Sequence, residues 1–311
     1  MTLTPEQQAE IEAQRTQSAE TRRATVPALE NILCQALPVL DQGFVRVIDY
    51  MGDDAAIVQA ARVSYGRGTR KVSDDRGLIN YLMRHRHTSP FEMCEIKLHV
   101  KLPIFVARQW IRHRTASVNE YSARYSILDD GSYRPAAEAV AEQAATNRQG
   151  RGTVLDTAAA ERAVERLEDG AARARDDYHW LLNQGPDADG SRPAISRELA
   201  RIVLPLSAYT QWYWKTDLHN LLHFIGLRAD PHAQYEIRAY ADLLLDIVRK
   251  WVPLTAAAFA DYRLGAATLS ASALAVLRRM LAGETVGQAE SGLSPGEWRE
   301  LQAVLDPAGD R

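Results

Sequence analysis

The chain has 311 residues, enough for one or two domains with a sizeable core. Its 37 lysine and arginine residues nearly balance 40 aspartate and glutamate residues, for a formal net charge of −3, which argues against a general nucleic-acid-binding protein with a basic surface. No apolar run approaches membrane-spanning length, and Cys34 and Cys94 are the only cysteines, so we expect a cytoplasmic chain without a disulfide framework.

Two periodicities alternate along the first part of the chain. Apolar side chains at every second residue predict strands, and apolar side chains at helical spacing predict helices. The predicted strands cover 43–49 and 93–101, and the predicted helices cover 53–62, 74–84 and 103–111. Cys94 lies in the apolar row of the second strand, where a cysteine usually behaves as a small hydrophobe. Residues 1–24 predict at most one loose helix, which begins after Thr4 and Pro5.

The second part of the chain is mostly helical by the same criteria. The predicted helices cover 155–182, 197–204, a segment that begins after Thr216 or Asp217, a segment from Asp230 and Pro231 to about Val252, and a small hairpin within 265–311. Residues 126–152 predict an irregular surface segment. Residues 209–214 are unusually aromatic, which favours a place in the core.

One short stretch concentrates positive charge. From Arg108 to Arg124 the chain carries four arginines and His113 against a single carboxylate, Glu120. Arginine side chains bind phosphate oxygens through paired N–H groups and are costly to bury without an anion. A solvated basic helix face would explain the charge alone. A phosphorylated ligand is favoured instead, because Arg108 and Arg112 lie one turn apart beside the expected apolar face. That face is expected to consist of Ile104, Ala107 and Ile111.

Residues 112–124 read Arg-His-Arg-x-x-Ser-x-Asn-Glu-x-Ser-x-Arg, which matches at every fixed position the signature of the flavin-dependent thymidylate synthases. The resemblance extends from about residue 60 to about residue 259. It implies an α+β fold in which a mostly antiparallel sheet is flanked by long helices. No Rossmann fingerprint or P-loop is present, which agrees with the family's non-Rossmann flavin-binding fold. We therefore expect an N-terminal extension over 1–40, a synthase domain over 41–264 and a C-terminal helical extension over 265–311.

The resemblance also implies an activity. Members of the family convert dUMP to dTMP, with 5,10-methylenetetrahydrofolate as the carbon donor and FAD, reduced by NADPH, as the source of hydride. No cysteine nucleophile is needed, and the apolar row that holds Cys94 disfavours a thiolate. The family further implies a homotetramer with active sites shared between chains, and no nucleic-acid, membrane or metal partner.

The resemblance assigns roles to individual residues, with Arg228 as the catalytic group. A fixed cation beside the pyrimidine ring favours the ionised form of that ring. The expected dUMP-binding residues are Gln109, Arg112, Glu120, Tyr121, Ser122, Ala123, Arg124, Arg201 and Arg228. The expected FAD-binding residues are Ser64, His87, Ser89, Arg112, His113, Arg114, Glu120, Asp217, His219 and His223. The chain departs from the usual pattern at Ser89, Met93, Asp217, His219 and His223.

Other interpretations of these residues stay open at this point. His219 and His223 lie one helical turn apart, and with His232 they could form the zinc site of a hydrolase, although the glutamate of an HExxH motif is missing. The arginine stretch could belong to a nucleic-acid-binding module. Arg228 could simply end a helix, and His87 could be a structural histidine.

Overall fold

The computed structural model describes residues 4–63, 75–125, 131–144 and 150–306. The chain divides into two compact units, Met1–Phe259 and Ala260–Arg311. The expected boundaries at 40/41 and 264/265 stay a prediction. Among the helices of the described segments, none is both long and apolar enough to cross a membrane.

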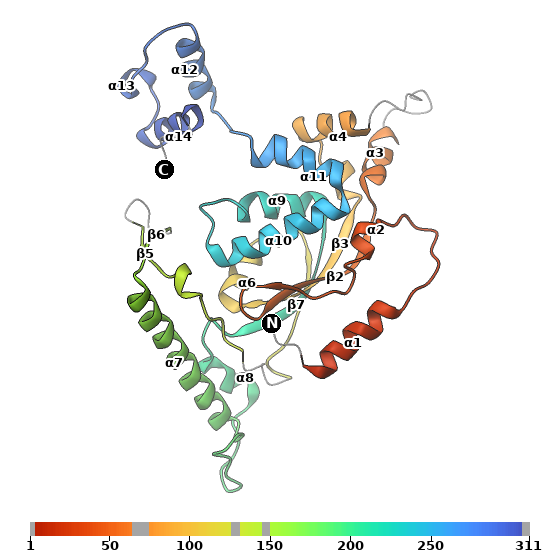
Figure 1. Cartoon of the computed structure of the whole chain (residues 1–311), viewed down its shortest axis with the longest axis vertical. Helices are drawn as coiled ribbons and strands as arrows, with labels where there is room; N and C mark the ends of the chain where they lie inside the picture. The colour runs from red at the N-terminus through yellow and green to blue at the C-terminus, as the bar shows by residue number, and fades with distance from the viewer. Residues whose placement is uncertain (1–3, 64–74, 126–130, 145–149, 307–311) are drawn as a thin grey trace. The chain divides into compact units, whose positions relative to one another are not determined.

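The first unit is built around a five-stranded sheet with the strand order β1-β2-β3-β7-β4 (Figure 1). All four neighbouring pairs are antiparallel, which confirms the predicted α+β class. The strands of this sheet are β1 (Leu37–Val39), β2 (Gly43–Met51), β3 (Glu95–Pro103), β4 (Ser117–Glu120) and β7 (Tyr209–Asp217). A separate hairpin pairs β5 (Ala141–Gln143) with β6 (Arg151–Val154).

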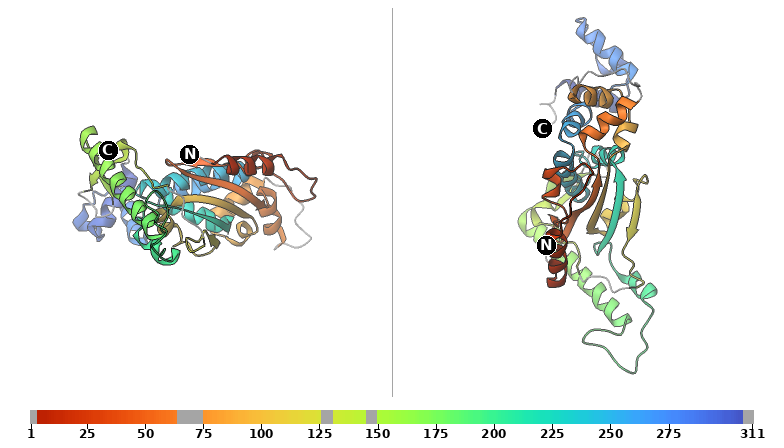
Figure 2. Two further views of the ribbon diagram at one scale, coloured as in Figure 1. Left: turned by 90° about the horizontal axis from the view of Figure 1, so that it is seen from below. Right: turned by 90° about the vertical axis from the view of Figure 1, so that its right-hand side faces the viewer.

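Helices surround this sheet and connect its strands. They are α1 (Pro5–Thr16), α2 (Pro27–Glu30), α3 (Asp54–Val63), α4 (Asp75–Arg84), α5 (Ser89–Glu92), α6 (Ile104–Trp110), α7 (Thr157–Leu181), α8 (Arg197–Ala200), α9 (Leu218–Arg228), α10 (Tyr235–Trp251) and α11 (Pro253–Phe259), with 3-10 turns η2 (Ala137–Ala139) and η3 (Arg201–Val203). The views in Figure 2 show α9 and α10 layered on one side of the sheet.

An aromatic cluster joins the helices to this face of the sheet. Trp212 and Trp214 alternate with outward residues along β7 and are almost fully buried. The Trp110 ring of α6 meets both of them edge-on, with ring centroids 5.8 and 5.4 Å away. It also packs at 4.6 Å from Phe224 of α9 and at 5.9 Å from Tyr240 of α10. The predicted core role of the aromatic residues over 209–214 is therefore confirmed for Tyr209, Trp212 and Trp214 but wrong for Tyr213, which is 43% exposed. The same packing fixes α6, β7 and α9 relative to one another.

The strand predicted over 93–101 forms as β3 but begins two residues later, at Glu95, and continues to Pro103. Its apolar row consists of Cys94, Ile96, Leu98 and Val100, and none of these is more than 1% exposed. The opposite face is polar and partly covered by α1. The buried Arg46 donates to Gln14 of α1 at 2.7 Å and lies 3.2 Å from Nδ1 of His99. The loose helix expected after Thr4 is thus tied to the sheet by a specific hydrogen bond.

Three local predictions are wrong. Helix α10 begins at Tyr235, because the Asp230 carboxylate accepts from the His232 backbone N–H and makes a turn instead of a helix cap. The helix expected over 197–204 consists of one α-helical turn and one 3-10 turn, and the Ser196 side chain forms no capping hydrogen bond. The segment over 126–152, expected to be irregular, contains η2, β5 and the start of β6.

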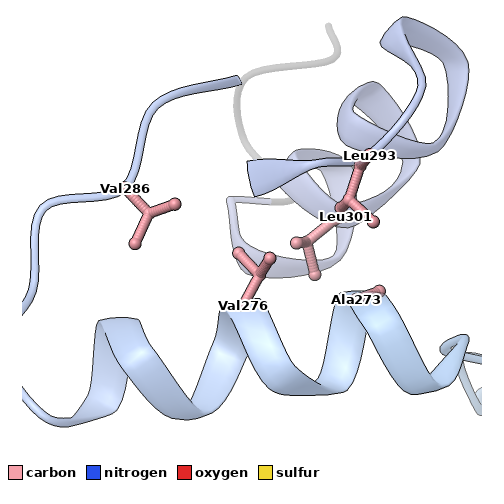
Figure 3. Packing of buried hydrophobic residues seen from close by; sticks show 5 residues of the cluster. All are labelled: Ala273, Val276, Val286, Leu293 and Leu301. Atoms are coloured by element: carbon pink, nitrogen blue, oxygen red, sulfur yellow. The ribbon is translucent and has the colours of Figure 1, made fainter. Parts of the chain in front are cut away.

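The second unit has its own small core. It begins with a π-helical turn, η4 (Ala260–Leu264), and continues with α12 (Ala271–Leu281), α13 (Gln288–Ser291) and α14 (Pro295–Leu305). The buried side chains in Figure 3 are Ala273, Val276, Val286, Leu293 and Leu301. Trp298 packs against them. The chain therefore folds here into three short helices, one more than the expected hairpin.

Candidate active site

A pocket of about 530 Å³ opens where the chain leaves α6, beside β7 and α9. Its size suits a small ligand or part of a larger cofactor. The pocket is lined by Arg112, His113, Arg114, Thr115, Trp214, Thr216, His219, Asn220, His223, Leu227 and Arg228. Among these lining residues, all of which are described, no aspartate or glutamate occurs, so the charge of the pocket is positive.

The turn after α6 contributes four of the lining residues, Arg112, His113, Arg114 and Thr115. Trp110 is fully buried, and the His113 N–H donates to the Trp110 carbonyl at 3.0 Å, which turns the chain out of the core. The Thr216 hydroxyl then donates to the Thr115 carbonyl at 3.0 Å and closes the turn against β7. Beyond it, Ser117 pairs with Lys215. Arg112 and Arg114 are thereby held at the surface, one on each side of His113.

The expected apolar face of α6 is confirmed at Ala107 but wrong at Ile104 and Ile111. The buried residues are Val106, Ala107 and Trp110, whereas Ile111 is 38% exposed and Ile104 is half-buried. Arg108 is exposed, so it does not border the core. The arginines that line the pocket come instead from the turn after this helix, at Arg112 and Arg114, and from the end of α9, at Arg228.

Arg228 and His113 form the central contact of the pocket. Nε of Arg228 donates to Nε2 of His113 at 3.1 Å, and Nη2 lies 3.5 Å from the Gln109 carbonyl oxygen. Burial, followed by the charge of Arg228 and the proximity of His223, lowers the pKa of His113 to about 4. His113 is therefore neutral near pH 7, accepts at Nε2 and carries its proton on Nδ1. Burial also lowers the pKa of Arg228.

The other two arginines have no protein partner among the described residues. Neither Arg112 nor Arg114 forms a hydrogen bond or an ion pair with any residue in the described segments. Together with Arg228 they place three guanidinium groups around one opening. An anionic ligand would balance the positive charge of these three groups, since guanidinium groups bind phosphate bidentately. The donor set therefore fits a phosphate-bearing nucleotide or a dinucleotide cofactor such as FAD.

Helix α9 supplies the opposite wall. Asp217 caps this helix, because its carboxylate accepts from the Asn220 N–H at 2.9 Å and from the Asn220 amide at 2.7 Å. Its oxygens are therefore engaged at the helix start, and a flavin contact by this residue stays a prediction. His219 and His223 both line the pocket, and the His223 ring lies 5.8 Å from that of His113.

The zinc interpretation finds no support in this geometry. His232 is bonded to Asp230 at 2.9 Å, and its side chain is 88% exposed. It does not line the pocket that holds His219 and His223. Within the described ranges, no three His, Cys, Asp or Glu side chains are grouped so as to hold a metal ion.

A second group of expected site residues does not line this pocket. Glu120 pairs with Trp212, whereas Ser117 pairs with Lys215 nearer the pocket, so Glu120 lies roughly 10 Å farther along the strand. The Thr210 hydroxyl donates to Glu120 at 2.8 Å. The group consists of Gln109, Glu120, Tyr121, Ser122, Ala123, Arg124 and Arg201.

Part of this second group is gathered around α8. Arg197 donates to the Tyr125 carbonyl oxygen at 2.6 Å, which ties the end of the signature to the segment that carries Arg201. The Arg124 guanidinium lies over the Tyr125 ring at 5.3 Å from its centroid. Within one chain the expected dUMP-binding residues are therefore divided between the pocket and a second region near α8.

The remaining expected residues lie near α5 or outside the described segments. His87 and Ser89 are exposed at the start of α5, which packs against α9, and neither lines the pocket. Ser64 falls outside the described residues. Cys94 is fully buried, and burial, followed by the charges of Asp53 and Asp54, raises the pKa of its thiol to about 12.

Sequence reasoning missed several lining residues. They are Thr115, Trp214, Thr216, Asn220 and Leu227. Thr115 stands at an unspecified position within the signature, and Thr216 is a polar residue at the end of an aromatic strand. These two features were the only indications in the sequence. Neither predicts that Thr115 and Thr216 contact each other, because that contact depends on the pairing of β4 with β7.

Comparisons with known proteins agree with one another. Residues 46–254 match the family model described as thymidylate synthase complementing protein. A flavin-dependent thymidylate synthase from Gluconobacter oxydans is 64% identical over 99% of this chain and 100% of its own length, and one from Ruegeria pomeroyi is 62% identical over 98% and 99%. The crystal structure of the UMP/dUMP methylase PolB from Streptomyces cacaoi bound with 5-Br UMP has 35% identity and a TM-score of 0.63, covering 71% of this chain and 96% of that one.

Proposed function

Because this chain belongs to the flavin-dependent thymidylate synthase family, we propose that it converts dUMP to dTMP at the pocket between α6, β7 and α9. The observation that carries the proposal is the meeting of Arg112, Arg114 and Arg228 with a neutral His113 in one pocket. The co-substrates are 5,10-methylenetetrahydrofolate as the carbon donor and NADPH as the reductant. FAD, when bound, supplies the hydride.

Six of the lining residues have a physical task in this proposal. Arg112 and Arg114 neutralise phosphate oxygens, since they have no partner among the described residues. Arg228 offers a fixed cation to the pyrimidine, which lowers the free energy of its anionic form. Neutral His113 accepts from Nε of Arg228 and so fixes the plane of the guanidinium group. His219 and His223 line the pocket and would contact the flavin, in place of the residues usual in the family.

A cysteine nucleophile has no place in this scheme. Cys94 is the nearer of the two cysteines in sequence to the signature, and its thiol is held protonated by burial. A thiol with a raised pKa is a poor nucleophile at neutral pH. Activation of the pyrimidine is therefore assigned to the electrostatic effect of Arg228.

We also propose a homotetramer with shared active sites, because the expected dUMP-binding residues do not meet within one chain. In such an assembly, Arg124 and Arg201 of one chain complete the dUMP site beside the pocket of another. Three apolar residues near Arg201 support this part of the proposal, because large apolar side chains exposed together mark an interface. They are Leu199, Ile202 and Leu206, which are 55%, 71% and 64% exposed.

Mixing two inactive variants tests the shared site. If Arg228 and Arg201 act from different chains, equimolar Arg228→Ala and Arg201→Ala proteins, unfolded and refolded together, should regain turnover that neither shows alone. Light scattering should give four times the mass of one chain. Absence of any regained turnover in mixed tetramers would contradict sites shared between chains.

The activity itself is tested with the purified protein. We expect flavin absorbance and dTMP formation that requires dUMP, methylenetetrahydrofolate and NADPH together. UMP is the informative competitor, because the related methylase PolB is described as acting on UMP and dUMP. Preferential methylation of UMP would overturn the choice of dUMP, and protein that cannot be loaded with FAD would overturn the proposal as a whole.

We further propose that the protein is cytoplasmic and that its chain consists of a synthase domain with two extensions. Cys34 and Cys94 are both free thiols, which suits a reducing cytoplasm. We assign residues 1–40 and 265–311 as extensions of a synthase domain over 41–264.

A further inference from the structure

A buried carboxylate outside the pocket is linked to α6 by hydrogen bonds. Glu236, in the first turn of α10, is only 3% exposed. Its Oε1 accepts from the Tyr133 hydroxyl at 3.1 Å and from Arg151 at 2.5 Å. Its Oε2 accepts from the Gln234 amide at 2.9 Å. A carboxylate paired with a guanidinium group is an acceptor only, so both oxygens require donors.

This requirement fixes the orientation of two amides in series. Since Gln234 must turn its NH2 group toward Glu236, its Oε1 faces away and accepts from the NH2 group of Gln109. Gln109 is thereby held with its NH2 group occupied. Its own Oε1 receives no hydrogen bond from any residue in the described segments. The chain of contacts therefore presents the carbonyl oxygen of Gln109 as an acceptor from this turn of α6.

Gln109 stands at the edge of the candidate active site. Its backbone carbonyl oxygen lies 3.5 Å from Nη2 of Arg228, and Arg112 follows one turn later. A nucleotide carries both N–H and hydroxyl donors, and an acceptor of fixed orientation would bind one of them. An amide without such a constraint reverses easily, because its oxygen and nitrogen ends have nearly the same shape.

We propose that Glu236 is a positioning residue that acts through Gln234 to make Gln109 present its carbonyl oxygen to an N–H or O–H group of the nucleotide substrate. The inference rests on the proposed function, since it assumes that Gln109 contacts dUMP. The alternative role of Glu236 is purely structural. Arg151, from β6, also donates to the Ala139 carbonyl oxygen at 3.0 Å, so the Glu236–Arg151 pair could serve only to tie the hairpin to α10.

Glu236→Gln separates the two roles. The new amide can donate as well as accept, so it no longer dictates the orientation of Gln234. We expect the Kd of dUMP for the FAD-loaded protein, measured by titration calorimetry, to rise about threefold to tenfold, the range for one hydrogen bond. Tyr133→Phe is the matched control, because it removes a donor from Oε1 and leaves the Oε2–Gln234 contact intact. Its Kd should stay within about twofold of the wild-type value.

A double-mutant cycle tests the route through Gln109. If Glu236 acts on dUMP only through this side chain, Glu236→Gln should weaken binding no further in a Gln109→Ala background. Additive losses of affinity would show a structural role and overturn the proposal, and so would an unchanged Kd for Glu236→Gln. Failure of the wild-type protein to bind dUMP would instead count against the proposed function.

A second variant keeps the test decisive if Glu236→Gln fails to fold. Gln234 is exposed, so Gln234→Met interrupts the same chain without disturbing the buried carboxylate. It should raise the Kd of dUMP by a similar factor, again without further effect in the Gln109→Ala background. A Kd equal to that of the wild type would overturn the proposal.

Discussion

Substitution of Arg228 tests whether the charge of the pocket drives the proposed reaction. The guanidinium group is partly withdrawn from solvent, and its Nε is held by His113 at 3.1 Å, so its position is fixed before a substrate arrives. A unit charge about 4 Å from a developing anion is worth about 4 kcal/mol at an effective dielectric constant near 20. Because the pocket is open to water, we take about 2–4 kcal/mol, which corresponds to a fall in kcat of about 30-fold to 1000-fold for Arg228→Ala.

The companion variant Arg228→Lys separates charge from position. It keeps a cation but loses the Nε donor to His113, a hydrogen bond from a charged donor worth about 1.5 kcal/mol, so a fall of about tenfold is expected. The assay is dTMP formation by FAD-loaded protein at saturating dUMP, with FAD content measured by absorbance. Arg249→Ala is the control, since Arg249 forms a surface pair with Asp246 and lies outside the pocket. Arg228→Ala protein with full FAD and nearly wild-type kcat would refute the reasoning.

Three further results are expected. Burial lowers the pKa of both His99 and His113 to about 4, so the folded chain binds fewer protons than the unfolded chain, and the free energy of unfolding measured in urea should rise as the pH goes from about 4 to about 6.5. Asp54→Ala should lower the free energy of unfolding by about 2–4 kcal/mol, because this carboxylate accepts from both the N–H and the hydroxyl of Thr255 at the start of α11. Cys94→Ala should retain most of the dTMP-forming activity, because its thiol is held protonated.

Controls make each of these outcomes decisive. His99→Gln should weaken the dependence of stability on pH but not abolish it, because His113 still contributes. His232→Gln, at a side chain that is 88% exposed, should leave the dependence in place. Asp246→Ala removes only a surface ion pair and should cost less than about 1 kcal/mol. Equal losses for Asp54→Ala and Asp246→Ala would contradict the capping argument. Complete loss of turnover in a folded, FAD-loaded Cys94→Ala protein would contradict the absence of a thiolate step.

Short-range patterns predicted those elements whose form depends on local chemistry. The alternation over 93–101 predicted which side of β3 is buried, because successive side chains of a strand point to opposite faces. Asp217 was one of two predicted caps for α9, and its carboxylate does accept from the Asn220 N–H. Where a pattern allowed two outcomes, sequence reasoning failed. Asp230 with Pro231 suits either a helix start or a turn, and the structure contains the turn.

The buried face of α6 was predicted correctly only at Ala107, for a different reason. Its apolar residues are spread around the helix, so their spacing alone did not distinguish Ile104 and Ile111 from Val106 and Trp110. The residues that pack against α6 determine which of its faces is buried. Trp110 packs between the two tryptophans of β7 and Phe224 of α9, and burial of that large ring outweighs the smaller apolar side chains.

The sequence by itself determined the family, because the signature over 112–124 and its donors lie within one short window of the chain. Only the tertiary structure decided that Arg228 bonds to His113, since these residues are 115 positions apart and meet through the packing of α9 on β7 and α6. The tertiary structure also places Arg112 and Arg124 apart, although they are close in sequence. Strand β4 lies between them, so that Arg112 lines the pocket and Arg124 does not.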